Sequence, residues 1–331
     1  MLATIDRQPV DRPAAWLGQP TKEALPGLCA HFGASDLAGL KQAIDDDIWE
    51  IELPYHNGTT NAIYAAFDFQ RQHIGYTLTN RGYFADHTDG DGIDGFPWPD
   101  PKQFIDPGEC ARAAAAAPQG YAVMGVLWSA HFQDACAAFG MEEALVKMKT
   151  DPMIFKKVIG RIVDFYLEAN EIFYRATAGK LDMVLIGNDF GTQQGLLCSP
   201  QDLREFVFDG TKKLIEQAHR HGVKVVHHSC GAIFDVIDDL IGCGADAIHP
   251  IQALAKGMDA ERLKEAFAGR VSFCGGVDTQ ELLVHGSPQD VRRKVEELAA
   301  LFPTGLILSP SHEALMPDVP PQNVEAMFAR G

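Results

Sequence analysis

A His-x-Cys pair follows the most strand-like segment of the chain. Val225–His228 is a run of β-forming residues, and Ser229–Gly231 comes directly after it. Side chains alternate between the two faces of a strand, so His228 and Cys230 are expected to point the same way at its carboxyl end. An imidazole beside a thiol suits zinc, which needs at least one further ligand.

The elements that must position this pair alternate regularly along the chain. Strand-like segments alternate with amphipathic ones after residue 120, which is typical of a parallel α/β sheet. Two earlier candidates, 13–17 and 47–53, bring the strands to eight, the number in a (β/α)8 TIM barrel of this length. The later predicted strands are Tyr121–Trp128, Met183–Gly187, Lys224–His228, Ala247–Pro250, Val271–Cys274 and Leu306–Ser309.

The intervening segments predict helices at 152–178, 199–221, 234–241, 259–267 and 287–302. We expect residues 1–331 to form a single domain, with an N-terminal helical segment. Residues 55–105 break the alternation, and we expect a hairpin excursion over one mouth of the barrel there.

Polar residues gather where the predicted strands end. In barrels of this kind, functional side chains cluster at the carboxyl ends of the strands. His312, after the last strand, is the leading candidate for a third metal ligand, and Cys274 is a lesser one. Each residue also has a structural alternative: a histidine can fill a hydrogen-bonded niche, Asp189 can cap the next segment, and Cys274 can fill space under a turn. The set comprises Asp189, His228, Cys230, His249, Gln252, Cys274, Asp278 and His312.

The amino-acid composition limits which kinds of molecule this protein could bind. The chain has 28 basic and 45 acidic residues, a net charge of -17. Such a surface argues against binding nucleic acid or an anionic membrane, both of which require clustered Lys and Arg. No run is long enough for a membrane span, and the N-terminus lacks the apolar core of a secretion signal. We expect a soluble, cytoplasmic protein whose seven scattered cysteines are thiols or ligands rather than a disulfide framework.

Five stretches resemble the uroporphyrinogen decarboxylase superfamily, and within it the zinc-dependent, corrinoid-linked methyltransferases. They cover the C-terminal half in order, while the N-terminal third matches only in outline, through Val10–Pro13. The stretches are Asn188–Gln194, His228–Gly231, His249–Gln252, Cys274–Gln280 and Pro310–Glu313 with Asp318–Asn323.

The resemblance implies a function and a ligand set. His228 and Cys230 match the zinc-binding pair of the methyltransferases, and His312 stands where that branch has a later cysteine. The implied reaction moves a methyl group from a small donor, a methyl ether (O-demethylase chemistry) or a methylated amine, to cobalamin carried by a corrinoid-binding partner protein. Members are often dimers, so a homodimer is open. The implied catalytic residues are Asp189 and His249, and the substrate contacts are Gln252, Asn188, Asp278, Trp128 and Tyr55.

Two other functions stay open. One is a cofactor-free uroporphyrinogen decarboxylase of tetrapyrrole biosynthesis. Those decarboxylases carry an arginine-rich segment near the N-terminus, and the corresponding stretch 14–20 has no arginine. The other is a non-catalytic barrel that binds a corrinoid or a metal.

Overall fold

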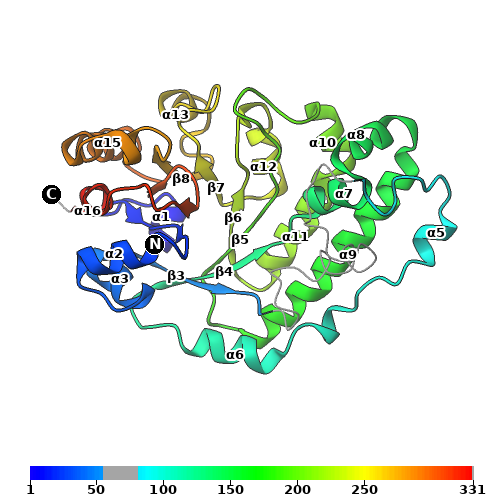
Figure 1. Cartoon of the computed structure of the whole chain (residues 1–331), viewed down its shortest axis with the longest axis horizontal. Helices are drawn as coiled ribbons and strands as arrows, with labels where there is room; N and C mark the ends of the chain where they lie inside the picture. The colour runs from blue at the N-terminus through cyan, green and yellow to red at the C-terminus, as the bar shows by residue number, and fades with distance from the viewer. Residues whose placement is uncertain (55–80, 330–331) are drawn as a thin grey trace.

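The computed structural model describes residues 1–54 and 81–329. Eight parallel strands of the described chain form one sheet in the order β1-β9-β8-β7-β6-β5-β4-β3 (Figure 1). The sheet curls into a nearly closed (β/α)8 barrel, which confirms the predicted fold class. The strands are β1 (Ala14–Ala15), β3 (Ile48–Glu52), β4 (Ala122–Trp128), β5 (Met183–Gly187), β6 (Lys224–His228), β7 (Ala247–Ile251), β8 (Ser272–Val277) and β9 (Leu306–Pro310).

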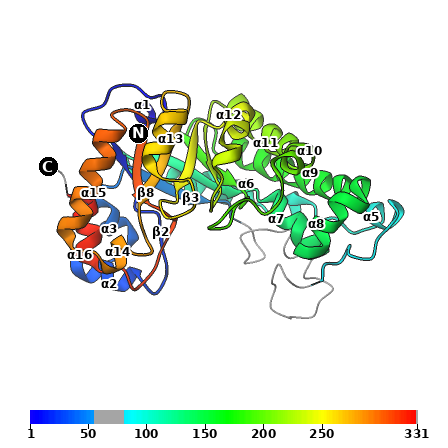
Figure 2. The ribbon, with the colours of Figure 1, turned by 90° about the horizontal axis from the view of Figure 1, so that it is seen from above.

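Helices cover the outside of the barrel. Figure 1 shows α15 with α16 on one side and the long α9 with α11 on the other, and in Figure 2 α7, α8 and α5 extend away from the barrel beside α9. The helices nearest the N-terminus are α1 (Leu2–Ile5), α2 (Leu25–Phe32), α3 (Leu37–Ile44), α5 (Asp91–Asp94) and α6 (Pro107–Ala115). Then come α7 (His131–Phe139), α8 (Met141–Thr150), α9 (Pro152–Ala176), α10 (Pro200–Phe206) and α11 (Phe208–Arg220). The last are α12 (Ile237–Cys243), α13 (Ala260–Phe267), α14 (Leu282–His285), α15 (Pro288–Leu301) and α16 (Pro321–Phe328).

Side chains complete the seam where the two ends of the sheet meet. The backbone N–H of Asp47 donates to the carbonyl of Ala15 (3.0 Å), and the Asp47 carboxylate accepts the N–H of Ala15 (2.8 Å). Arg12 holds the same carboxylate with two bonds of 2.6 and 2.8 Å. A small second sheet, β2 (Gln19–Pro20) with β10 (Ala314–Leu315), lies just beyond the seam.

The interior of the barrel is apolar and is covered at its amino-terminal end. Trp16, Met124 and Leu185 belong to the buried cluster that fills the barrel, and Ile5 of α1 packs into the same cluster. The hydroxyl of Ser272, at the start of β8, donates to the carbonyl of Ile5 (2.8 Å). The opposite end, where the strands finish, is therefore where a site can form.

The predicted elements agree with the structure except at a few boundaries. β5 and β6 have the predicted ends. The helix predicted at 199–221 is two helices, because Val207 (φ -119°) interrupts it. The helix predicted at 234–241 begins with the 3-10 turn η2 (Phe234–Val236), and α12 then runs on to Cys243.

The predicted excursion near residues 55–105 lies partly outside the described residues. Its described remainder, 81–105, contains α5 and the short 3-10 turn η1 (Pro101–Gln103) and no strand. Within the described ranges, none of the helices combines the length and the apolar character that crossing a bilayer requires.

Candidate metal centre

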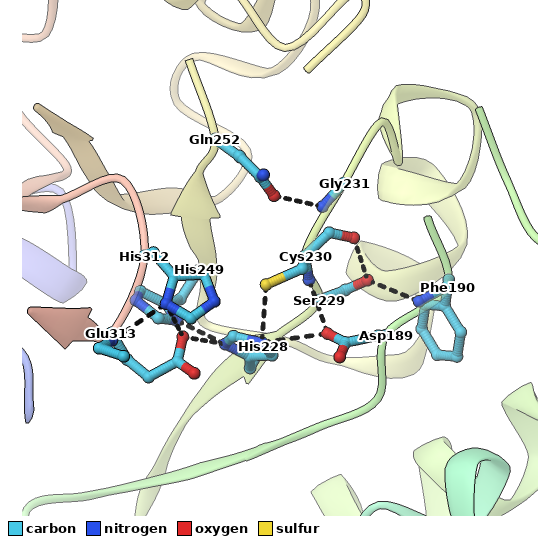
Figure 3. A network of polar contacts seen from close by, with 11 residues as sticks. Asp189, Phe190, His228, Ser229, Cys230, Gly231, His249, Gln252, His312 and Glu313 are labelled. Carbon is cyan, nitrogen blue, oxygen red and sulfur yellow. Dashed lines mark hydrogen bonds and ion pairs between the residues drawn. The ribbon is translucent and has the colours of Figure 1, made fainter. Parts of the chain in front are cut away.

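Six polar side chains meet at the carboxyl ends of four strands (Figure 3). They come from the loop after β5, from the end of β6, from β7, and from the loop after β9. The ends of neighbouring parallel strands meet at one rim of a barrel, which explains why residues so far apart in sequence become neighbours. We call this set the strand-end cluster: Asp189, His228, Cys230, His249, His312 and Glu313.

His228 lies at the centre of the cluster. Its Nε2 is 3.2 Å from Asp189 Oδ1 and 3.4 Å from Cys230 Sγ, and its Nδ1 is 2.9 Å from His249 Nδ1. Burial opposes a charge on the ring, yet Asp189, Cys230 and Glu313 together raise the pKa of His228 well above 6.5. Burial and the neighbouring charged His228 lower the pKa of His249 well below its usual value. The groups around His228 thus favour its charged form, and that charge disfavours protonation of His249.

Asp189 is the ionised partner of His228. Burial alone would raise the pKa of this carboxyl, but the hydrogen bond and charge of His228 outweigh burial and lower it. The same oxygen accepts the backbone N–H of Cys230 (3.0 Å). Asp189 thus ties the loop after β5 to both ends of the His-x-Cys motif.

The loop after β9 supplies the other half of the cluster. Cys230, His312 and Glu313 have possible ligand atoms within 4.8 Å of one another, and the neighbouring Cys230 raises the pKa of His312 despite partial burial. Glu313 Oε2 lies 3.4 Å from His312 Nδ1 and 3.7 Å from His228 Nδ1. This oxygen is buried and has no hydrogen-bond partner among the described residues. A buried carboxylate oxygen without a donor is costly unless a cation compensates it.

The donor atoms fit a zinc ion. Thiolate, imidazole and carboxylate are the groups that bind zinc in proteins, at about 2.0 to 2.3 Å. Tetrahedral coordination at those lengths places a sulfur and a nitrogen ligand about 3.5 Å apart, and Cys230 Sγ and His228 Nε2 are 3.4 Å apart. Among the residues that the structure describes, three overlapping ligand sets have donor atoms within 4.8 Å of one another: Asp189–His228–Cys230, His228–His249–Glu313 and Cys230–His312–Glu313.

Glycines explain how two loops approach closely enough to hold Cys230 in place. Gly231 has φ +87°, a conformation that glycine adopts without strain. A Cβ atom on Gly231 would lie 2.4 Å from the backbone of Gly191, which follows β5. The two loops therefore pack backbone against backbone, and no larger residue fits at position 231.

Trp128 forms a wall beside the cluster. Its ring meets the ring of His228 edge-on, with centroids 5.2 Å apart. Trp128 and Ser129 both have positive φ, 53° and 54°, which is rare for residues other than glycine. The register between β4 and β5 shifts at this point, and such irregularities redirect a side chain. The structure thus places this predicted substrate contact against a predicted metal ligand.

A cavity of about 250 Å³ adjoins the cluster at His312. Gln252, a predicted substrate contact, lines it, and Gln252 Oε1 accepts the backbone N–H of Gly231 (2.6 Å). Thr279 and Ser311 also line it, and their hydroxyls are 3.3 Å apart. The cavity is thus lined by neutral hydrogen-bonding groups beside a candidate metal ligand.

Three predicted residues are not brought to the cluster. The carboxamide oxygen of Asn188 accepts the N–H of Phe132 (2.7 Å), because Asn188 and Asp189 face opposite ways. The Asp278 carboxylate accepts the N–H groups at the start of α14. Cys274 is buried in the apolar interior, because β8 does not end there but continues to Val277. Tyr55 lies outside the described residues.

Glu313 is the member of the cluster that the sequence reasoning did not single out. The signal was available, since Glu313 directly follows His312 after the last strand. A carboxylate next to a candidate histidine ligand is a reasonable fourth ligand.

The described fold agrees with comparisons to known proteins. The family model for uroporphyrinogen decarboxylase (URO-D) matches residues 109–330, and the chain belongs to this family. Among solved structures, a methyltransferase from Methanosarcina mazei is similar, with a TM-score of 0.68 and 17% sequence identity over 98% of this chain and 95% of that one. At that identity the similarity concerns the fold. No curated protein matches the chain by sequence.

Proposed function

We propose that this protein is a zinc-dependent methyltransferase that moves a methyl group from a small donor to the cobalamin of a corrinoid protein. The observation that carries the proposal is the strand-end cluster, whose thiol, imidazoles and carboxylates form overlapping sets of possible metal ligands, two of which include the buried Glu313 Oε2 that lacks a hydrogen-bond donor among the described residues. The corrinoid acceptor rests on the sequence motifs that resemble the corrinoid-linked branch. The cavity beside His312 is the proposed donor site, and its size suits a small molecule.

Cys230, His228, His312 and Glu313 would hold the metal. Zinc bound there would supply Lewis acidity at the donor's oxygen or nitrogen. The ligands bind as thiolate and neutral imidazole, so His228 gives up its extra proton when the metal binds. Asp189 keeps its charge, because the pKa of this carboxyl is lowered, and with His228 and Cys230 it forms one of the possible ligand sets, so it would contribute a negative charge directly beside the metal.

The proposed reaction balances without a further reactant. The bond between the methyl carbon and the donor's oxygen or nitrogen breaks, and cobalt(I) supplies the electron pair for the new carbon–cobalt bond. The leaving oxygen or nitrogen takes up one proton. A neighbouring hydroxyl relays this proton from solvent most efficiently when it lies within hydrogen-bond reach, and the hydroxyls of Thr279 and Ser311 line the proposed donor cavity.

Metal analysis of matched cysteine variants tests the ligand assignment. We expect about one zinc per chain in the parent and a loss of bound zinc in Cys230→Ala. Cys198→Ala removes a partly exposed thiol outside the cluster, and Cys274→Ala removes a buried thiol of the barrel interior; both should keep the metal. Equal zinc in the Cys230→Ala variant and the parent would refute the metal centre.

Activity assays separate the remaining functions. Consumption of cob(I)alamin with formation of methylcobalamin, dependent on a methyl ether or methylated amine, supports methyl transfer. Family membership keeps a uroporphyrinogen decarboxylase as the second candidate, and conversion of uroporphyrinogen by zinc-free protein would establish it instead. Binding of zinc and cobalamin without turnover of any donor in a broad panel would indicate a non-catalytic barrel.

A further inference from the structure

The strained turn at Trp128 and Ser129 is held from behind by buried polar groups. Two consecutive non-glycine residues in the left-handed region are uncommon, and such strain persists only where the surroundings impose it. The turn directs the indole of Trp128 against the ring of His228. The groups that impose this conformation therefore act on the candidate site without touching it.

Asn170 of α9 holds one side of the turn. Its Nδ2 donates to the Ser129 hydroxyl at 3.0 Å, and that hydroxyl lies 3.4 Å from Asn170 Oδ1. Both residues are buried, Asn170 at 0% and Ser129 at 1% exposure. A buried amide is kept in place by its hydrogen bonds, so this pair fixes Ser129 relative to the long helix.

Asn188 holds the other side, through the first turn of α7. Its Oδ1 accepts the N–H of Phe132 (2.7 Å), and its Nδ2 lies 3.3 Å from His131 Nδ1. The N–H of His131 donates to the carbonyl of Ser129 (2.8 Å). Asn188 thus anchors the segment that follows the turn, while the adjacent Asp189 faces the strand-end cluster.

We propose that Asn170 and Asn188 are positioning residues: they hold the Trp128–Ser129 turn, and the turn holds the indole of Trp128 against the ring of His228. The consequence for zinc binding rests on the proposed function. The placement of Trp128 against His228 does not, and it can be measured without any metal or reaction.

The first experiment measures how well acrylamide quenches the fluorescence of Trp128. Each protein is compared with its own Trp128→Phe counterpart, so that the difference isolates this tryptophan from the other three. We expect acrylamide to quench Trp128 more efficiently in Asn170→Ala, Asn188→Ala and Ser129→Gly than in the parent. Asn323→Ala is the matched control, because Asn323 is an equally buried asparagine that binds the carbonyls of Leu283 and Gly286 elsewhere.

A thermal melt establishes that each variant is folded, and Ser129→Gly covers the case in which Asn170→Ala does not fold. Unchanged protection of Trp128 in a folded Asn170→Ala or Ser129→Gly protein would overturn the inference. So would an equal loss of protection in Asn323→Ala, because that would show general loosening.

The second experiment titrates zinc into each protein in competition with a chelator. We expect Asn170→Ala and Asn188→Ala to bind zinc about tenfold more weakly than the parent, because the ring that packs against His228 is no longer held, while Asn323→Ala binds it equally well. Parent-like zinc affinity in a folded Asn170→Ala protein would refute the effect on the metal centre. If no protein in the series binds zinc, the proposed function fails, and the quenching result still decides whether the two asparagines position Trp128.

Discussion

Replacing Lys41 by methionine should destabilise the protein strongly, although Lys41 is remote from the strand-end cluster. Lys41 is fully buried, and its ammonium is 2.8 Å from Asp46, 2.8 Å from Glu50 and 3.1 Å from the carbonyl of Ile48. Methionine preserves the length of the side chain but leaves two buried carboxylates without a cation. Removing one partner of a buried ion pair costs about 3–5 kcal/mol.

The structure places the expected loss at the lower end of that range, about 3 kcal/mol. Asp46 keeps the backbone N–H groups of Leu17 and Ile48, and Glu50 keeps the indole N–H of Trp16. These donors compensate part of each charge. Folded domains are stable by about 5–15 kcal/mol, so the variant should remain folded and measurable.

The loss should depend on pH in a defined direction. Burial raises the pKa of Asp46 to about 6, although Lys41 opposes this effect, so removing Lys41 raises that pKa further. A carboxyl whose folded pKa lies above its unfolded value of 3.8 binds more protons in the folded state. Its contribution to stability therefore falls as pH rises through that window, and the penalty of Lys41→Met should shrink as pH is lowered from 8 towards 5.

Urea unfolding at several pH values measures the effect. Lys213→Met is the matched control, because the Lys213 ammonium forms an exposed ion pair with the Asp209 carboxylate at 2.7 Å. Such a pair should contribute less than about 1 kcal/mol to the free energy of unfolding. A second comparison is the double variant Lys41→Met/Asp46→Asn, which should recover part of the loss. Equal losses for Lys41→Met and Lys213→Met, or a penalty that grows on acidification, would refute this reasoning.

Three further predictions concern single groups. Of the cysteines, Cys230 and Cys198 are partly exposed, so iodoacetamide should label these two first. Added Zn²⁺ should slow the labelling of Cys230 but not that of Cys198. Equal labelling of Cys230 with and without Zn²⁺ would contradict the metal centre. Asp189→Asn should weaken zinc binding by about 10- to 100-fold in a competition titration with a chelator, because it removes a carboxylate charge from the ligand set that includes His228 and Cys230, and unchanged affinity would count against that role. Burial opposes the charge of Glu171, but hydrogen bonds led by that from His221 lower its pKa to about 2. The stability that Glu171 contributes is therefore present above its unfolded pKa of 4.5 and is lost as pH falls towards 2. In urea unfolding, Glu171→Gln should cost about 1 kcal/mol at pH 7 and nothing near pH 2.

The sequence predicted the barrel and the half of the site that follows directly from strand periodicity. β6 is a run of β-forming residues with an unambiguous end, so the placement of His228 and Cys230 required only alternation and the rule that strand ends share one rim. The same rule predicted that Asp189 and His312 would lie nearby, and the structure brings them into contact with the pair.

The remainder depended on features that the sequence does not display. Gly275 and Gly276 look like a turn that ends a strand, but both lie inside β8, where a Cβ atom on Gly275 would meet the backbone of Ile251 at 2.7 Å. Cys274 is consequently buried below the rim rather than exposed on it. The position of Glu313 depends on the path of the loop after β9, which tertiary packing determines rather than local propensity.

A chain of side-chain contacts connects the seam of the barrel to the strand-end cluster, and it gives the charged Glu50 a role beside the apolar interior. Glu50 accepts the indole N–H of Trp16 at 2.5 Å, and the ring of Trp16 packs against the ring of His249 with centroids 5.2 Å apart. His249 in turn meets His228. An apolar group in place of Glu50 would leave the indole N–H without this acceptor and the buried Lys41 with one carboxylate fewer. The Glu50 carboxylate therefore fixes the orientation of the Trp16 ring, on which the geometry of the cluster depends. Buried polar groups that add no net stability can still favour one conformation over others in this way.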